Sequence, residues 1–292
     1  MERFDLAFTP SRGPSRADAL RQGREAVAIA SAGSYVTPSG RTIDLAADVA
    51  RAVEQSRDYL PETCPDVTRA SLSARDFATR ITVVNGTSLA SARAIAARGA
   101  TPLVLNFASA KNPGGGFLNG ARAQEESLAR SSALYACLTK SGMYAHHREE
   151  AGNAECLYSD WMIHSPNVPV FRDDESGALL EQPYLCTFLT TPAPNAAVVL
   201  QREPSRGQEV NAVMIARVTR ALAICAAAGH RHLVLGAWGC GVFGNDPAVV
   251  ARAFGAELDG TYAGVFEEVV FAVLDWSEER RFIRPFAERF AS

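Results

Sequence analysis

Two adjacent glutamates, Glu125 and Glu126, lie a short distance after a run of three glycines. The segment reads Asn-Pro-Gly-Gly-Gly over residues 112–116, then seven residues, then Gln-Glu-Glu over 124–126. Because glycine lacks a Cβ and tolerates positive φ, a triple glycine lets the backbone approach a ligand closely. Carboxyl groups beside such a loop can donate and accept protons at whatever the loop holds. The segment therefore indicates an enzyme active site.

A second glycine-rich segment follows a short apolar run at 232–235. Its residues Gly239, Gly241 and Gly244 match the G-x-G-x-x-G pattern of dinucleotide-binding domains. That pattern belongs to the first strand of a Rossmann domain, whereas this chain ends at residue 292, soon after Gly244. A nicotinamide-dependent oxidoreductase is therefore disfavoured.

The same segment can still bind an anion without belonging to a Rossmann domain. A strand, a glycine turn and a helix N-terminus together present backbone N–H groups that attract phosphate. The alternative is that the glycines only form a tight turn, and one loop alone leaves both interpretations open. Two glycine loops at the ends of two predicted parallel strands favour a shared phosphate-bearing ligand, because open α/β sheets bind ligands at those ends.

The composition is that of a globular protein that does not attract polyanions by its overall charge. The chain has 292 residues, of which 47% are hydrophobic and 21% charged, and its net charge is −3. Its length fits one large α/β domain with an extension, or two modest domains. With no basic field over the whole molecule, neither sequence-specific nucleic acid nor a membrane surface is an expected partner. A polyanionic ligand must be held by local groups.

Cysteine spacing and the N-terminal sequence predict a cytoplasmic protein. The six cysteines, at positions 64, 137, 156, 186, 225 and 240, lie far apart and form no C-x-x-C pair. Such spacing indicates reduced thiols, and neither a disulfide framework nor a zinc site. The first residues contain no apolar core of a signal peptide, and no uninterrupted apolar run approaches the ~20 residues that a membrane span needs.

The segments that must position the two loops alternate between strand and helix patterns. Helical spacing at 16–31 and 43–59 predicts an N-terminal helical extension over residues 1–75, followed by a catalytic core over 76–292. Within the core, apolar runs predict strands at 81–84, 102–107, 159–164, 168–171, 184–190, 232–235 and 269–274, and helical periodicity predicts helices at 88–98, 124–140, 208–228 and 247–258, before a last helix with Phe282, Phe286 and Phe290. Asn245 or Asp246 can cap the helix at 247. The alternation predicts an α/β fold with a mostly parallel sheet and helices on both faces.

The combination of the glycine run at 114–116 with Gln-Glu-Glu at 124–126 resembles the signature of the poly(ADP-ribose) glycohydrolases. The surroundings are similar to the microbial branch of that family, namely Asn-Phe-Ala at 106–108 and Gly-Ala-Trp-Gly-Cys-Gly-Val-Phe-Gly-Asn at 236–245. The resemblance covers about residues 20–290. It implies a macrodomain, which is a three-layer α/β/α sandwich around a mixed, mostly parallel sheet with ADP-ribose across the strand ends.

The resemblance also implies a set of ligand contacts. Backbone at Gly115 and Gly116 would approach ribose and phosphate, the loop at 239–242 would donate N–H groups to the diphosphate, and Phe243 would stack near the ribose. The ligand-binding residues expected on this basis are Asn106, Ala108, Asn112, Gly115, Gly116, Gln124, Gly239, Gly241, Val242, Phe243 and Asn245. Whether Ser109 or Asn112 contacts the ribose stays open, because the spacer before the glycines is one residue longer than in the animal enzymes.

The two glutamates are expected to have different roles in hydrolysis of a ribose–ribose bond. Such hydrolysis needs protonation of the leaving hydroxyl and stabilisation of an oxocarbenium-like centre. Adjacent helical residues point about 100° apart, so the pair cannot face each other as two opposed carboxylates. The resemblance implies that Glu126 is the general acid and then the base, and that Glu125 holds the ribose. The substrate would be poly(ADP-ribose) on modified proteins and the product ADP-ribose, with no cofactor and no metal.

Two other functions use the same loops. A reader that binds ADP-ribose without hydrolysis needs the phosphate loop but no carboxyl group at the reaction centre, so the glutamate pair disfavours it. A hydrolase of other ADP-ribose derivatives stays open. Cys240 is more consistent with a small apolar filler than with a nucleophile, and the pair His146-His147 with surface residues than with a metal site.

Overall fold

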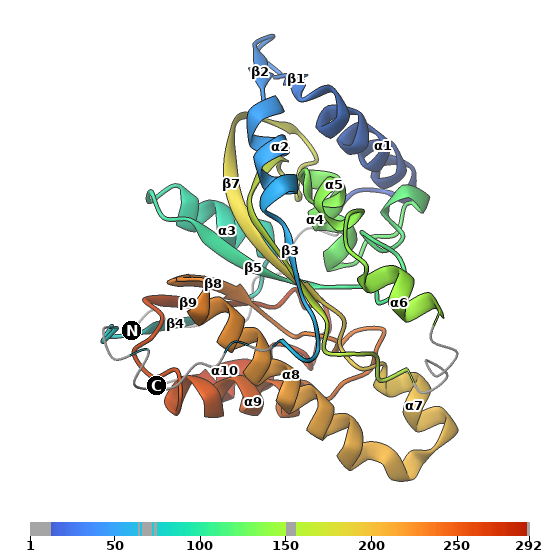
Figure 1. Ribbon diagram of the computed structural model, residues 1–292, viewed down its shortest axis with the longest axis vertical. Helices are drawn as coiled ribbons and strands as arrows, with labels where there is room; N and C mark the ends of the chain where they lie inside the picture. Colours follow the sequence, from blue (N-terminus) through green and yellow to red (C-terminus); the bar gives the residue numbers. More distant parts are fainter. Residues whose placement is uncertain (1–12, 64, 66–71, 73–74, 150–155, 291–292) are drawn as a thin grey trace.

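The centre of the protein is a mixed, mostly parallel seven-stranded sheet (Figure 1). The computed structural model describes residues 13–63, 65, 72, 75–149 and 156–290. In spatial order the strands are β3 (Arg57–Tyr59), β6 (Met162–Arg172), β7 (Leu179–Thr191), β5 (Pro102–Phe107), β8 (His232–Leu235), β9 (Glu268–Ala272) and β4 (Arg80–Val84). The pairs β5–β7, β5–β8, β8–β9 and β4–β9 are parallel, whereas β3–β6 and β6–β7 are antiparallel.

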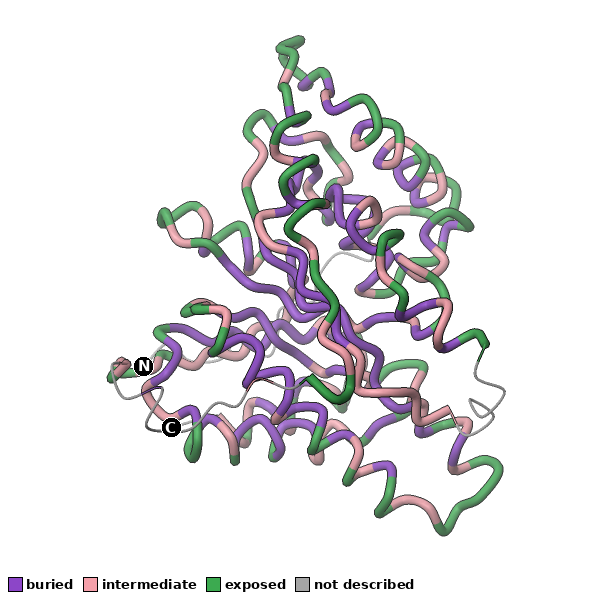
Figure 2. Tube along the Cα trace, in the orientation of Figure 1, coloured by how far each residue is buried: buried purple, intermediate pink, exposed green. Residues whose placement is uncertain are grey.

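Helices cover both faces of the sheet and create two apolar cores. Alternation along β5 shows this, because Leu103 and Leu105 pack into one core and Val104 into the other. The first core contains α8 (Gly207–Ala227), α9 (Pro247–Asp259) and α10 (Arg284–Phe290), and the second contains α1 (Arg16–Ala32), α2 (Ala46–Gln55), α3 (Ser88–Ala96), α4 (Gln124–Ser131), α5 (Leu134–Leu138) and α6 (Met143–Glu149). Buried residues concentrate where these layers meet (Figure 2). The predicted three-layer α/β/α fold is confirmed.

Short elements complete the chain. A two-stranded sheet joins β1 (Ser34–Val36) and β2 (Thr42–Asp44), and η1 (Phe117–Asn119), α7 (Ala196–Arg202) and η3 (Pro204–Arg206) lie in the connections. The stretch Pro204–Ala227 is long and apolar enough to cross a membrane by length and composition alone, but most of it is buried within this fold.

The expected helix over 43–59 is wrong at both ends. Residues 42–44 pair with β1, and residues 57–59 add β3 to the edge of the large sheet, so only Ala46–Gln55 is helical. Helical spacing of apolar residues is a weak prior that pairing with other strands overrides. The N-terminal segment also covers the glutamate helix, because α1 packs on α4 and Glu25 pairs with the buried Arg172 at 2.8 Å. The division at residue 75 stays a prediction.

Two other expected elements differ in the structure. The helix expected over 124–140 is interrupted at Ser132, whose hydroxyl donates to the carbonyl of Leu128 at 2.7 Å and accepts from the N–H of Leu134 at 3.2 Å. A serine that bonds to nearby backbone in this way competes with helix continuation. The strands expected at 159–164 and 168–171 form the single strand β6, which has a register shift between Ser165 and Val168.

Candidate active site

One cavity of about 780 Å³ opens where the parallel strands end. Its lining includes Gly86 after β4, Ala108 after β5, Ala193 after β7, Ala237 after β8 and Val273 after β9. The first turn of α4, with both glutamates, forms one wall. Open α/β sheets bind ligands at this edge, beyond the carboxyl ends of their strands.

The glycine loop is shaped around the two carboxyl groups. Gly114 and Gly115 have φ of 70° and 61°, which glycine adopts without strain. The N–H of Gly116 donates to Oε1 of Glu126 at 2.9 Å. A Cβ at Gly115 would clash with Oε1 of Glu126 and lie 3.0 Å from Oε2 of Glu125. The second glycine is therefore required by the approach of both glutamates to the loop.

Glu125 is the more deeply buried of the pair, with 3% of its surface exposed against 9% for Glu126. Its Oε2 accepts a hydrogen bond of 2.6 Å from the N–H of Ser109. Burial raises the pKa of Glu125 well above its ordinary value, and the nearby Glu126 raises it further, while the Ser109 N–H and the Asn106 side chain oppose the shift. Oε1 of Glu125 and Oε2 of Glu126 accept no hydrogen bond from the described residues. One buried oxygen of each carboxyl group is thus without a protein partner among the described residues.

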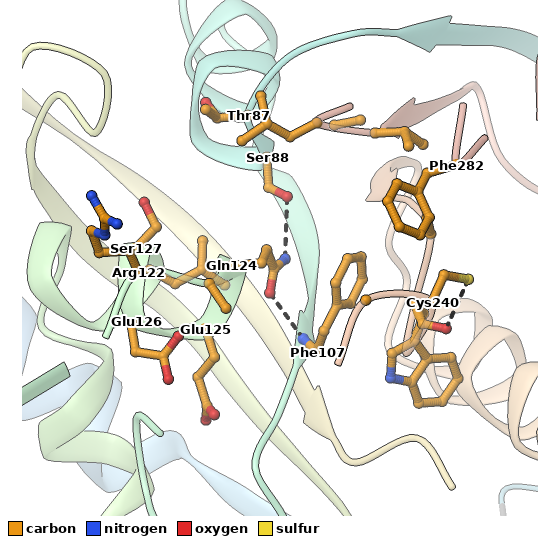
Figure 3. Close-up of a pocket in the computed structure, with 18 of the residues that line it drawn as sticks. Thr87, Ser88, Phe107, Arg122, Gln124, Glu125, Glu126, Ser127, Cys240 and Phe282 are labelled. Atoms are coloured by element: carbon orange, nitrogen blue, oxygen red, sulfur yellow. Dashed lines mark hydrogen bonds between the residues drawn. The ribbon is translucent and has the colours of Figure 1, made fainter. Parts of the chain in front are cut away.

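Gln124 fixes the start of the glutamate helix to the end of β5. Its Oε1 accepts from the N–H of Phe107 at 3.0 Å, and its Nε2 donates to the carbonyl of Leu105 at 2.8 Å and to Oγ of Ser88 at 3.1 Å (Figure 3). No side chain caps this helix at Ala123. Three hydrogen bonds of one amide therefore fix the position of the first helical turn, which carries the two glutamates. Gln124 thus has a structural role in addition to lining the cavity.

The second glycine loop presents backbone to the same cavity. Gly239, Gly241, Val242 and Phe243 all line it. Within the described chain, the N–H groups of residues 241–243 have no hydrogen-bond acceptor. Val242 is 89% exposed, and a Cβ at Gly241 would meet nothing within 4 Å. The loop therefore offers an open row of N–H donors suited to an anion.

Buried side chains hold this phosphate loop, which we define as residues 236–246, in place. Nδ2 of Asn245 donates to the carbonyl of Pro194 at 2.8 Å and to that of Gly239 at 3.1 Å. Asp246, rather than Asn245, caps α9 by accepting from the N–H of Ala248 at 2.8 Å. Asn245 thus acts behind the loop and does not line the cavity.

The structure separates the other expected site residues into cavity lining and support. Ala108 lines the cavity, whereas Asn106, Asn112, Gly115 and Gly116 do not. Nδ2 of the fully buried Asn106 donates to Oγ1 of Thr190 at 3.1 Å. Ser109 lines the cavity, and its hydroxyl accepts from the N–H of Asn112 at 3.2 Å.

Three aromatic residues that were not among the expected ligand-binding residues also line the cavity. They are Phe107, Trp276 and Phe282, and in Figure 3 Phe107 lies between Glu125 and Phe282. Phe107 was expected as the last residue of the strand at 102–107 and Phe282 as part of the last helix, and neither expectation pointed to the cavity. A flat apolar wall of this kind suits a stacked aromatic base.

A buried carboxyl group next to the glutamate helix was also missed. Oδ1 of Asp174 accepts from Oγ1 of Thr87, and its Oδ2 from Oγ of Ser127, both at 3.1 Å. Burial raises the pKa of Asp174 to about 6. Arg130 is buried and lies on the same helix as Glu126. It is close enough to interact with the carboxyl groups of Asp174 and Glu126. These residues come from distant segments, so their proximity is not visible in the sequence.

Cys240 and the pair His146-His147 were expected to have no role in catalysis or metal binding. The Cys240 thiol is buried, its Sγ lies 3.6 Å from the carbonyl of Trp238, and burial raises its pKa. His147 is fully buried and bonded to protein atoms, so the expected surface pair is wrong for this residue. Among the described residues no group of three or more His, Cys, Asp or Glu side chains could hold a metal ion.

The comparisons with known proteins agree with this geometry. The family model for the microbial-type PARG catalytic domain matches residues 23–173. The poly(ADP-ribose) glycohydrolase (PARG) of Thermomonospora curvata is 46% identical, covers 94% of this chain and 100% of its own, and superposes with a TM-score of 0.84. A structure of the same enzyme bound to the inhibitor ADP-HPD gives the same values.

A second relative has been solved with a ligand. The glycohydrolase of Deinococcus radiodurans in complex with ADP-ribose is 43% identical, covers 85% of this chain and 98% of its own, and has a TM-score of 0.77. The comparison with curated proteins finds no match. Because the family model spans more than half of the chain and the similar structures cover nearly all of it, this protein belongs to the microbial-type poly(ADP-ribose) glycohydrolase family.

Proposed function

We propose that this protein hydrolyses the ribose–ribose O-glycosidic bonds of poly(ADP-ribose) and releases ADP-ribose. One observation carries the proposal. Two carboxyl groups, each anchored by one oxygen to a loop N–H, lie in the same cavity as an open row of backbone donors. A glycosidase needs the first feature and a diphosphate ligand needs the second.

The cavity gives each part of ADP-ribose a chemically matched place. The N–H groups at 241–243 are proposed to bind the diphosphate, and the wall with Trp276 and Phe282 to stack on the adenine. The terminal ribose then lies against the two glutamates. The solved relatives bound to ADP-ribose and to ADP-HPD support this choice of ligand.

Glu126 is proposed as the general acid and base. In the first step its carboxyl proton passes to the leaving ribose oxygen as the glycosidic C–O bond breaks. In the second step the carboxylate takes a proton from water while the water oxygen bonds to the anomeric carbon, so that the glutamate ends protonated as it began. Its position supports this role, because Oε1 is held by Gly116 while Oε2 has no partner among the described residues.

Glu125 is proposed to hold the sugar. Because its pKa is raised, Glu125 keeps a proton to higher pH than an exposed glutamate does, and the protonated group can donate as well as accept. Such a group suits a ribose hydroxyl, which also both donates and accepts. The raised pKa also fits a general acid, so the division of roles between Glu125 and Glu126 is the point that substitution must decide.

The test is release of ADP-ribose from polymer made by automodification of a polymerase. Wild-type protein is expected to release ADP-ribose and Glu126→Ala is expected to release none while still binding it. Binding without release by either protein would establish an ADP-ribose reader instead. Release only from proteins that carry a single ADP-ribose would establish a hydrolase of other derivatives.

We also propose that the protein works in the cytoplasm without a metal or a cofactor. Four buried cysteines, Cys137, Cys186, Cys225 and Cys240, carry free thiols, which is consistent with a reducing compartment. The chemistry above uses only protein side chains and water. Activity that disappears with a chelator and returns with a divalent ion would contradict the metal-free mechanism.

A further inference from the structure

His147 makes a complete set of hydrogen bonds that the proposed chemistry does not use. It lies on α6 and is fully buried. Its Nδ1 lies 3.1 Å from the carbonyl oxygen of Ala110, and its Nε2 lies 3.1 Å from the N–H nitrogen and 2.7 Å from Oγ of Ser159. Because a carbonyl only accepts and an N–H only donates, the proton must be on Nδ1 and Nε2 must be the acceptor.

These bonds join the loop that holds Glu125 to a distant segment. Ala110 is the neighbour of Ser109, whose N–H anchors Oε2 of Glu125 at 2.6 Å. On the other side, Ser159 precedes β6 and follows Tyr158, a non-glycine residue with φ of 61°. A side chain at positive φ persists only where its surroundings hold it, and such strain is concentrated at functional sites.

Arg217 holds the same segment from its other side. It lies in α8, and 1% of its surface is exposed. Its Nη2 donates to the carbonyl of Tyr158 at 3.1 Å, and its Nε to Oδ1 of Asp160 at 2.8 Å. Its Nη1 donates to the carbonyl of Pro192 at 2.9 Å. One buried guanidinium therefore ties residues 158–160 to the end of β7.

The end of β7 leads directly to the phosphate loop. Two residues after Pro192, the carbonyl of Pro194 accepts the Asn245 hydrogen bond of 2.8 Å that also fixes Gly239. In addition, the ring of Tyr158 packs on Phe243 with 6.2 Å between ring centroids. A continuous chain of buried contacts thus runs from the glutamate loop to the phosphate loop.

We infer that His147 and Arg217 are positioning residues that set the distance between Glu125, which the Ser109 N–H anchors, and the diphosphate site on the phosphate loop. The inference rests on the proposed function, since it concerns that same site. A displacement of about 1 Å between bound substrate and catalytic group can lower a rate about a hundredfold. Loss of the contacts of His147 or of Arg217 should leave the glutamate loop and the phosphate loop each intact but shift one relative to the other. Catalysis should therefore suffer more than binding.

Burial, with nearby positive charge, keeps His147 in the neutral form that these hydrogen bonds require. Burial lowers the pKa of His147 to about 4, and the facing His146, Arg217 and Lys111 lower it too, although the Ala110 carbonyl opposes them. The imidazole is therefore neutral at neutral pH, so that Nε2 can accept from Ser159. Protonation would place two N–H groups against each other there.

The experiment compares three variants of the full chain with wild type for polymer hydrolysis and for ADP-ribose binding by calorimetry. His147→Phe keeps a ring but loses all three hydrogen bonds to Ala110 and Ser159, and His147→Asn keeps a donor for the Ala110 carbonyl. His146→Phe, on the same helix and half-buried, is the control. We expect His147→Phe to lower kcat about ten- to a hundredfold, in line with displaced groups, with the Kd for ADP-ribose within about threefold, the Asn variant intermediate and the control unchanged.

Binding stoichiometry reports the folded fraction, so a folding defect is separated from a catalytic one. If His147→Phe does not fold, Arg217→Lys takes its place, because it keeps the charge and loses the three-pronged contact. A kcat within about twofold of wild type for either folded variant would overturn the inference, as would equal losses of kcat and of ADP-ribose affinity. Inactive wild-type protein would instead contradict the proposed function.

Discussion

Gly116 and Glu126 are joined by a hydrogen bond of 2.9 Å from the backbone N–H to Oε1, across ten positions of sequence. This bond, and the matching one from Ser109 to Glu125, make the glycine loop and the glutamate helix one unit. The glycines are therefore fitted to the carboxyl groups. Their spacing in the sequence reflects both contacts.

Gly115→Ala is expected to abolish hydrolysis and to leave ADP-ribose binding within about tenfold. The new Cβ would clash with Oε1 of Glu126 and lie 3.0 Å from Oε2 of Glu125. The alanine would also have to keep φ of 61°, which costs about 1–2 kcal/mol for a non-glycine residue. Polymer hydrolysis and calorimetry measure the two effects. Gly207→Ala, where a Cβ meets only one side-chain atom at 3.9 Å, is the matched control. Full activity in Gly115→Ala would show that the loop adapts freely.

Glu125→Gln is expected to be more stable than wild type at pH 7–8. A folded-state pKa above the unfolded value means that the stabilising, protonated form exists below the unfolded pKa of about 4.3 and is lost as pH rises through the folded pKa. Glutamine stays neutral throughout. Burial raises the pKa of Glu125 well above normal, so the variant should have the higher unfolding free energy at pH 8, and the difference should disappear near pH 4. Denaturant unfolding at both pH values provides the measurement; equal stabilities at pH 8 would contradict it.

Asp174→Asn is expected to remove a pH-dependent loss of stability. The Asp174 pKa is raised from 3.8 to about 6 by burial, so the protonated form stabilises the fold below pH ~4 and this contribution is lost as pH rises through 6. The shift corresponds to about 3 kcal/mol at most. Relative to the asparagine variant, wild type should lose about 2–3 kcal/mol of unfolding free energy between pH 4 and 7. Parallel pH profiles would contradict the assignment to Asp174, and Asp173, which is paired with Arg93, provides a matched control as Asp173→Asn.

Val242→Asp is expected to weaken ADP-ribose binding without changing stability. Val242 is 89% exposed, so its side chain contributes little to the core, but a carboxylate there would lie beside the proposed diphosphate site. Repulsion between like charges near a protein surface is worth on the order of 1–4 kcal/mol at contact distances, so the Kd should rise about tenfold or more. Val242→Thr controls for the change in shape, and added salt should reduce the difference. An unchanged Kd would show that the diphosphate does not bind beside Val242.

The fold and the two loops were predictable because their signals are local. The strand at 102–107 and the glycine runs appear in contiguous residues, and parallel strands bring their ends to one edge. The helix over 43–59 was wrong because β3 is defined by pairing with β6, which is more than 100 positions away. No local pattern contains that partner.

Support residues were the part that the sequence could not provide. Asp174 is joined to the glutamate helix by a bond from Ser127, and His147 is joined to the loop and to the segment before β6 by its contacts with Ala110 and Ser159. Such residues are recognised by what surrounds them in space. Asn106 and Asn245 illustrate the converse, since both were expected at the ligand and both lie behind the loops that line the cavity.

The most direct test of the account compares Glu126→Gln with Glu125→Gln for hydrolysis of poly(ADP-ribose), alongside the Kd of each for ADP-ribose. Removal of a general acid or base typically costs about 10²–10⁴-fold in rate. The account predicts that Glu126→Gln loses about this much in kcat with nearly unchanged Kd, whereas Glu125→Gln loses affinity for ADP-ribose as well as rate. Wild-type kcat in Glu126→Gln would contradict it, and so would loss of rate alone in Glu125→Gln.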